Sequence, residues 1–338
     1  MSVRRNKKFL TGIATENQRL SADGQIFVPV TQRIRYDDAE ITRCLINTTK
    51  TKLMFMEAST NQCVRYLVEN KVSVNVFAHN FASEGCPGGG YLNGAKAQEE
   101  IECYQIPGLY PSINKVKYPL EPGTILVTPG LRILRDSETY ELLPEDRQIG
   151  LGIVSAAAQN LSKKNEVYDD EQTKITLANL FCSVKKSCPL TDTLVLGAWG
   201  CGVFRNDPKV MAREILDSIN QFGGYYQNIC IAIPPGPNLR EFREVFGDLV
   251  QDLVLNESED QEDKEGYEGN EDNDGKDQDS NENENANHGK NENKHQTLDD
   301  KIMRENFEAQ SACTYRQSKK SNRKKINSEK HQWVPDYD

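Results

Sequence analysis

The chain has 338 residues and a formal net charge of −10, but residues 1–250 carry 28 basic and 28 acidic side chains and are neutral. A neutral stretch of this length suits one globular domain with a sizeable core, whereas the polar remainder cannot build a second core. The sequence has no apolar run of the roughly 18–20 residues that a membrane-spanning helix needs, and no apolar segment of a secretory signal follows its basic start.

In the first half of the chain, apolar periodicity and turn residues predict helices alternating with strands. We expect helices at residues 3–20, 57–70 and 95–104, and strands at residues 26–30, 72–78 and 124–128. The run at 26–30 is predicted as an edge strand because Pro29 cannot donate a ladder hydrogen bond. Pro129 and Gly130 are expected to close the strand at 124–128.

The second half continues the alternation. We expect helices at residues 174–186, 208–222 and 239–250, strands at 193–197 and 228–233, and either type at 152–158. Asp207 and Pro208 suit the cap and the first position of a helix. Alternating strands and helices indicate an α/β domain whose sheet is covered on both faces.

The tail has two parts. Residues 256–295 are rich in Asp, Glu, Asn and Gly, with almost no apolar side chains, and we expect them to be disordered. Residues 319–325 (KKSNRKK) form a basic cluster that suits nuclear import, nucleic-acid binding or a plain solvated charge run. We therefore expect a folded domain at 1–250 and a disordered acidic, then basic tail at 251–338.

The cysteines and histidines limit the chemistry. The nine cysteines are scattered, form no C-x-x-C pair and mostly lie in apolar stretches, which predicts reduced, buried thiols in a nuclear or cytoplasmic protein. Only His79 of the four histidines lies outside the tail. This argues against a histidine-based catalytic triad or a histidine-rich zinc site in the folded part, which would have to use His79 alone.

Two glycine-rich loops each follow a predicted strand and precede a helix. They are residues 87–90 (PGGG) and residues 197–204 (GAWGCGVF). Glycines let backbone N–H groups approach an anion, and a following helix N-terminus adds a favourable dipole. Two such loops would clamp a diphosphate from opposite sides. A pair of ordinary tight turns stays open as the alternative.

Two adjacent acids follow the first loop. Glu99 and Glu100 lie nine and ten residues past Gly90, near the start of a predicted helix. A carboxylic acid beside a bound sugar phosphate can protonate a glycosidic oxygen and later activate water. Neighbours on a helix point about 100° apart, so the two acids should have different roles. The alternative is a solvated surface pair.

Residues 87–100 (PGGGYLNGAKAQEE) resemble the GGG…QEE signature of bacterial-type poly(ADP-ribose) glycohydrolases. Residues 80–83 (NFAS) and residues 196–208 (LGAWGCGVFRNDP) are also similar to that family. The resemblance runs from about residue 3 to 250 and leaves the tail outside it.

The resemblance implies a macrodomain-like, three-layer α/β/α fold with a mixed sheet. It implies hydrolysis of ribose–ribose O-glycosidic bonds in poly(ADP-ribose), with no cofactor and no metal. By position, Glu100 would be the catalytic acid/base and Glu99 would hold ribose hydroxyls. Substrate contacts would fall to Asn80, Gly88, Gly89, Gly90, Gln98, Gly200, Cys201, Gly202, Val203 and Phe204.

The implied partner is poly(ADP-ribose) or an ADP-ribosylated protein. We expect a monomer with neither a membrane partner nor sequence-specific nucleic-acid binding. Cys201 is not expected to be a nucleophile, since Arg205 is the only basic residue near it. Three alternatives stay open: a binding module that does not cleave ADP-ribose, a hydrolase of mono-ADP-ribose, and an interaction protein that acts through its tail.

Overall fold

An eight-stranded sheet organises residues 6–44 and 51–254, which are the parts of the chain that the computed structural model describes. Its strands, in spatial order, are β1 (Gln32–Ile34), β4 (Ile125–Ile133), β5 (Ile149–Ala156), β3 (Val76–Phe81), β6 (Thr193–Leu196), β7 (Asn228–Ala232), β2 (Lys52–Met56) and β8 (Gln251–Leu253). The neighbours from β5 to β8 are parallel, whereas β1 and β4 add to the sheet in antiparallel pairs. The expected mixed sheet is therefore confirmed.

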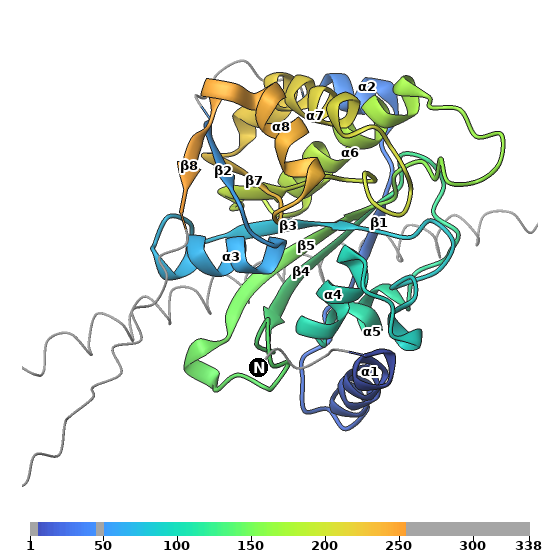
Figure 1. Ribbon diagram of the computed structural model, residues 1–338, viewed down its shortest axis with the longest axis vertical. Coiled ribbons are helices and arrows are strands. Elements are labelled where there is room, and N and C mark those ends of the chain that lie inside the picture. The colour runs from blue at the N-terminus through green and yellow to red at the C-terminus, as the bar shows by residue number, and fades with distance from the viewer. Residues whose placement is uncertain (1–5, 45–50, 255–338) are drawn as a thin grey trace, which may run out of the picture.

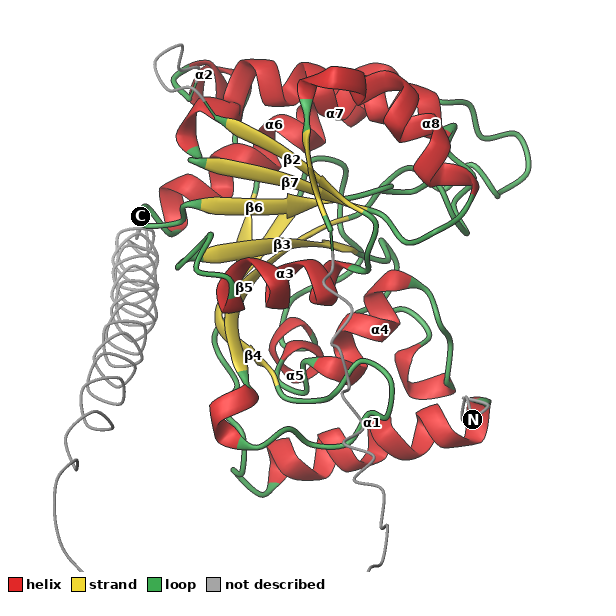
Figure 2. Ribbon diagram, turned by 60° about the vertical axis from the view of Figure 1, so that its left-hand side comes forward, coloured by secondary structure: helices red, strands yellow, loops and turns green. Residues whose placement is uncertain are grey.

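Helices cover both faces of this sheet (Figure 1). One layer contains α2 (Asp38–Thr42), α6 (Asp170–Ser187), α7 (Pro208–Phe222) and α8 (Pro237–Phe246). The other contains α1 (Lys7–Ala22), α3 (Thr60–Glu69), α4 (Gln98–Gln105) and α5 (Leu109–Ile113). Figure 2 shows the two layers on either side of the strands. The expected three-layer α/β/α arrangement is confirmed.

The strands are apolar on both faces because both faces are buried. In β7, Ile229 and Ile231 join the core beneath α6, α7 and α8, whereas Cys230 and Ala232 join the core beneath α3. This explains why the buried strands read as continuous apolar runs. Among the described residues, eight cysteines are free thiols, of which six are buried, as the sequence predicts; Cys313 lies outside the described residues.

Local signals fix where several helices begin. Asp207 caps α7 and accepts hydrogen bonds from the backbone N–H groups of Lys209 and Val210, with Pro208 at the first helical position. This confirms the expected start. Ser59 and Gln62 form a capping box at the start of α3, which therefore begins three residues later than the expected 57–70.

Two expected strands are corrected. Residues 26–30 form no strand, because the ladder with β4 begins only at Gln32, opposite Val127. The strand at 124–128 does not close at Pro129 and Gly130 but continues to Ile133. The register shifts between Thr128 and Leu131, and Gly130 adopts φ +77° there. Pro129 and Gly130 therefore form a bulge within a longer strand.

The expected strand at 72–78 is displaced along the chain to 76–81. The Asp192 carboxylate accepts the backbone N–H groups of Val74 and Asn75, which are therefore satisfied outside the ladder. Residues 152–158, which fitted either type, lie mainly in β5. Sequence patterns did not predict β1, β2, β8, α2 and α5, which have only three to five residues each.

The sheet takes in residues beyond position 250, since β8 pairs with β2 in parallel. The expected disordered tail and its basic cluster lie, from residue 255 onward, outside the described residues. No helix in the described ranges has the length and apolarity needed to cross a bilayer.

Candidate active site

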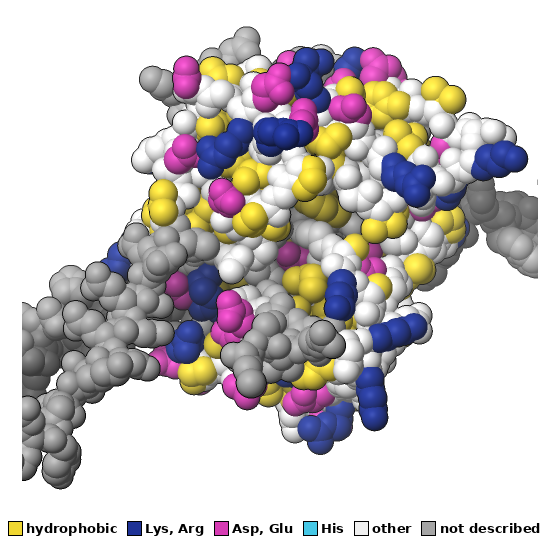
Figure 3. Space-filling view, in the orientation of Figure 1, with side chains coloured by type: hydrophobic (Ala, Val, Ile, Leu, Met, Phe, Trp, Pro, Cys, Tyr) yellow, Lys and Arg dark blue, Asp and Glu magenta, His cyan; other side chains and the backbone are white. Residues whose placement is uncertain are grey.

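The two glycine-rich loops leave neighbouring strands. Residues 82–97 lead from β3 to α4, and residues 197–207 lead from β6 to α7. Because β3 and β6 are paired in parallel, Val76 opposite Thr193, both loops emerge at the same edge of the sheet. The face shown in Figure 3 is hollowed near its middle, between the two helix layers, and acidic side chains are visible there.

Glu100 is buried in the first turn of α4, with 6% of its surface exposed. Its Oε1 accepts a hydrogen bond from the backbone N–H of Gly90 at 2.8 Å. Its Oε2 is buried and has no hydrogen-bond partner among the described residues. A buried polar atom without a partner is rare in a folded protein, and a ligand or a water can supply the missing partner. One carboxylate oxygen is thus held in place and the other is available.

Glu99 is held at both carboxylate oxygens. Oε1 accepts from Asn80 Nδ2 at 3.3 Å, and Oε2 accepts from the backbone N–H of Ser83 at 2.8 Å. Asn80 also donates to Ser155 Oγ at 3.0 Å, which fixes its amide. Burial raises the pKa of Glu99 to about 8, although the hydrogen bonds from Ser83 and Asn80 act in the opposite direction. Burial therefore favours the protonated form of this carboxyl near neutral pH.

The first loop lies directly against both acids. Gly89 adopts φ +51°, and a Cβ atom built on it would lie 2.5 Å from Glu100 Oε1 and 3.2 Å from Glu99 Oε2. A Cβ on Gly90 would lie 2.6 Å from the Cβ of Ala95. Only glycine fits such a close approach of backbone to side chain.

Gln98 ties α4 to the end of β3. Its Oε1 accepts the backbone N–H of Phe81 at 2.8 Å, and its Nε2 donates to the His79 carbonyl at 2.9 Å. It also donates to Glu102 Oε1 at 3.3 Å. Burial raises the pKa of Glu102 to about 8, against a smaller opposing effect of its hydrogen bond with Asn61. The Gln98 amide is thus occupied by protein partners.

The second loop presents free backbone donors. Gly202 and Val203 are exposed, and Phe204 is half-buried. Within the described residues, none of the backbone N–H groups of Gly202, Val203 and Phe204 donates to a backbone carbonyl. Successive free N–H groups ahead of a helix N-terminus favour an anion such as phosphate.

Asn206 fixes the shape of this loop. Its Nδ2 donates to the Gly200 carbonyl at 3.1 Å and to the Gln159 carbonyl at 2.8 Å. Gly200 adopts φ +73°, and a Cβ on it would lie 2.6 Å from Asn206 Nδ2. The Asn206 amide therefore packs where a side chain at position 200 would sit.

The segment at 157–169 touches both loops. The Leu161 N–H donates to the Phe204 carbonyl at 2.9 Å, and the Lys163 ammonium forms an ion pair with Glu84. These contacts join the loop after β6 to the loop after β3.

Cys201 and His79 are poorly suited to nucleophilic or acid–base roles. Burial, with a smaller contribution from Asp207, raises the pKa of the Cys201 thiol to about 12. Burial lowers the pKa of His79 to about 3, and its ring packs against Phe81 and Trp199. The expectation that Cys201 is no nucleophile agrees with this environment. Within residues 6–44 and 51–254, no three His, Cys, Asp or Glu side chains are grouped as a metal site requires.

Sequence patterns did not assign roles to several residues at this site. Ser83, at the end of the NFAS run, and Ser155 hold the Glu99–Asn80 pair, but the sequence alone assigned a role to neither of them. The Tyr118 hydroxyl is buried without a partner among the described residues, and its pKa is raised by burial and by nearby Glu99. Glu102 follows Gln98 by four residues in α4. This spacing makes the two side chains neighbours on a helix, so their contact could be predicted from the sequence.

Comparisons with known proteins find similarity to one family of enzymes. Residues 11–121 match the family model for the catalytic domain of microbial-type PARG. The crystal structure of poly(ADP-ribose) glycohydrolase (PARG) from Thermomonospora curvata is 25% identical, with a TM-score of 0.60, covering 70% of this chain and 99% of that one. The Deinococcus radiodurans enzyme in complex with ADP-ribose is 27% identical, with a TM-score of 0.51, covering 70% and 98%. No curated protein matches the sequence.

Proposed function

We propose that the chain is a microbial-type poly(ADP-ribose) glycohydrolase, which hydrolyses the ribose–ribose O-glycosidic bonds of poly(ADP-ribose) and releases ADP-ribose. The observation that carries this proposal is the state of Glu100. Its Oε1 is fixed by the Gly90 N–H, and its buried Oε2 is left without a partner beside the first glycine loop. A module that only binds ADP-ribose has no need of such an acid.

Glu100 acts as the acid and then the base. In its protonated form it donates to the ribose oxygen that leaves as the glycosidic bond breaks, and the resulting carboxylate then takes a proton from the attacking water. The transition state resembles an oxocarbenium ion, which a nearby carboxylate stabilises. The two steps return Glu100 to its starting form.

Glu99 holds the ribose next to the scissile bond. Its carboxyl is fixed by Asn80 and Ser83, so it offers a rigid partner for ribose hydroxyl groups. In its protonated form the group can both donate and accept a hydrogen bond. Asn80 orients the terminal ribose from the same side. Gln98 supports the site indirectly, because its hydrogen bond with the Phe81 N–H keeps α4 against β3.

The two glycine loops bind the diphosphate. Gly88, Gly89 and Gly90 contact the diphosphate and the ribose on the side of the scissile bond. The free backbone N–H groups of Gly202 and Val203 contact the diphosphate from the other side, and Gly200 and Cys201 shape the loop that presents them. Phe204 packs on the ribose or the adenine. Binding energy from the diphosphate then holds the reacting ribose against Glu100.

The catalytic domain extends through β8, so the boundary expected at residue 250 moves past Leu253, and the chain from residue 255 onward is an accessory tail. The domain acts as a monomer in the nucleus, the cytoplasm or both, on poly(ADP-ribose) or ADP-ribosylated proteins. It uses no membrane and no sequence-specific nucleic-acid contact.

The test is incubation of the full chain with purified poly(ADP-ribose) and, separately, with mono-ADP-ribosylated protein, followed by detection of free ADP-ribose. The proposal expects release from the polymer. Tight binding of ADP-ribose without release from either substrate would leave a binding module. Release from the mono-ADP-ribosylated protein alone would assign the chain to hydrolases of that linkage.

A further inference from the structure

The carboxyl end of α4 is capped by a residue from the N-terminal helix. Asn17, at 1% exposed, lies in α1 and donates its Nδ2 to the Cys103 carbonyl at 3.3 Å and to the Tyr104 carbonyl at 3.0 Å. The last carbonyls of a helix have no partner within the helix, and a buried helix end needs donors from elsewhere. Eighty-six residues separate Asn17 from Cys103, so this cap joins two distant parts of the chain.

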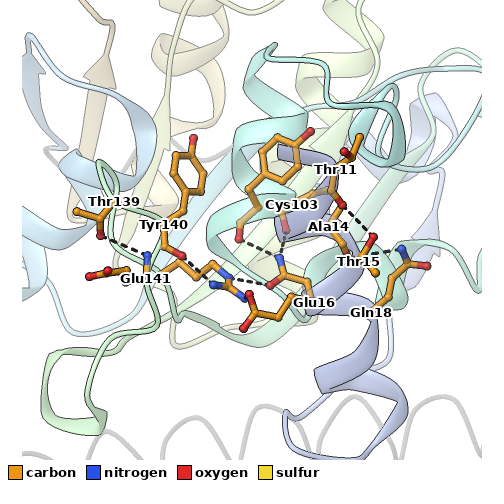
Figure 4. Close-up of polar contacts among 12 residues, drawn as sticks. Thr11, Ala14, Thr15, Glu16, Gln18, Cys103, Thr139, Tyr140 and Glu141 are labelled. Atoms are coloured by element: carbon orange, nitrogen blue, oxygen red, sulfur yellow. Dashed lines mark hydrogen bonds and ion pairs between the residues drawn. The ribbon is translucent and has the colours of Figure 1, made fainter. Parts of the chain in front are cut away.

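Arg135 sets the orientation of the Asn17 amide. This buried guanidinium donates its Nε to Asn17 Oδ1 at 2.8 Å, so the amide nitrogen must face α4. Its other nitrogens reach the Tyr140 carbonyl at 2.7 Å and Glu16 Oε2 at 3.0 Å (Figure 4). The backbone N–H of Arg135 also donates to the carbonyl of Gln105, the last residue of α4. The guanidinium is a cation close to a helix C-terminus, which the helix dipole favours.

The same helix α1 supports the first glycine loop. A Cβ on Gly94, which adopts φ +74°, would lie 2.6 Å from the Lys7 carbonyl. The Tyr91 hydroxyl donates to the Ala14 carbonyl at 3.4 Å. α1 thus contacts both the loop that presents Gly90 and the helix that presents Glu100.

We propose that α1 is part of the active-site framework, and that Asn17, oriented by Arg135, is a positioning residue for Glu100. α4 has only eight residues, so its two ends are about 12 Å apart and move together. Its start has no side-chain cap, because Ala97 occupies the N-cap position. Gln98 anchors one end of α4, and Asn17 anchors the other together with the backbone N–H of Arg135. This inference rests on the proposed glycohydrolase function.

Two substitutions at one position separate positioning from packing. Asn17→Asp keeps the shape of the side chain and the bond from Arg135, but its carboxylate cannot donate to the Cys103 and Tyr104 carbonyls. Asn17→Ala removes both bonds. Thr15→Ala is the matched control on α1, since the Thr15 hydroxyl is exposed and donates only to the Thr11 carbonyl (Figure 4).

The full chain is assayed for kcat on poly(ADP-ribose), per binding site counted by calorimetric titration with ADP-ribose. We expect both Asn17 variants to lose about 10-fold or more in kcat, because a shift of the catalytic group by a fraction of an ångström is costly. Their Kd for ADP-ribose should stay within about threefold of wild type, because the residues of the two loops are unchanged. Thr15→Ala should match wild type.

An unchanged kcat per binding site in Asn17→Asp would overturn the positioning role, whatever the melting temperature of the variant. If Asn17→Ala yields no folded protein, Asn17→Asp and Arg135→Lys test the positioning role in its place. Both variants retain a polar or charged group at the buried Asn17–Arg135 contact. Absence of turnover in wild type would instead refute the proposed function itself.

Discussion

Gly89→Ala perturbs the site at the point where the backbone is closest to both acids. A Cβ at this position would lie 2.5 Å from Glu100 Oε1, whereas ordinary contact begins near 3.4 Å, so the carboxylate must move by roughly 0.9 Å. Such a shift also strains its bond from the Gly90 N–H, which is 2.8 Å long. Displacements of about 1 Å can cost about 100-fold in rate, and we expect kcat to fall by about that factor.

The same substitution also costs stability, and this must be separated from the catalytic effect. Gly89 adopts φ +51°, a conformation that costs an alanine about 1–2 kcal/mol. Gly24→Ala is the matched control, because Gly24 adopts φ +68° with nothing within 4 Å of a Cβ. It should lose similar stability without a change in kcat.

The assay is the initial rate of ADP-ribose release at saturating poly(ADP-ribose), paired with denaturant unfolding of each variant. Equal kcat values for Gly89→Ala and Gly24→Ala would refute the reasoning, since the catalytic loss is assigned to contact with Glu100 and not to backbone strain.

Three further predictions concern neighbouring residues. Glu102→Gln should flatten the pH dependence of the free energy of unfolding. The Glu102 carboxyl has a pKa of about 8 when folded and near 4.5 when unfolded, so it makes stability fall as pH rises between those values, by at most about 1.4 kcal/mol per pH unit. Denaturation at pH 5, 6.5 and 8 measures this slope, and an unaltered slope in the variant would show the prediction to be wrong. Cys201→Ala should keep kcat within about twofold, because a thiol with a pKa of about 12 stays protonated, and a tenfold loss in steady-state turnover would argue for a chemical role of the thiol. Val203→Asp should weaken ADP-ribose binding about 10-fold in calorimetry, because the new carboxylate repels the diphosphate. The melting temperature should not change, since Val203 is 69% exposed, and an unchanged affinity would place the diphosphate elsewhere.

Local features of the site were predictable from sequence. Each glycine loop is a short contiguous run, and the two acids follow the first loop by nine and ten residues. Glycine allows backbone conformations in these runs that other residues avoid. The parallel pairing of β3 with β6 then brings the loops to one edge, as expected for an α/β sheet. The cap at Asp207 was likewise a local signal.

Long-range features were not predictable in the same way. The Asn17–Arg135 contact spans 118 residues, and neither side chain belongs to a pattern. The strand expected at 26–30 had the right composition but no partner, and the bulge at Gly130 depends on the register with β5. Pairing, burial and register decide these features, and a single sequence does not encode them locally.

The central claim is that the free oxygen of Glu100 performs the proton transfers. Glu100→Gln tests it most directly, because the amide keeps the side-chain shape and the bond from the Gly90 N–H but cannot give up and regain a proton in this way. Single-turnover hydrolysis of poly(ADP-ribose) should slow by about 100-fold to 10,000-fold, with the Kd for ADP-ribose within about threefold of wild type. Hydrolysis within tenfold of the wild-type rate would contradict the claim and move the proton transfers to another group.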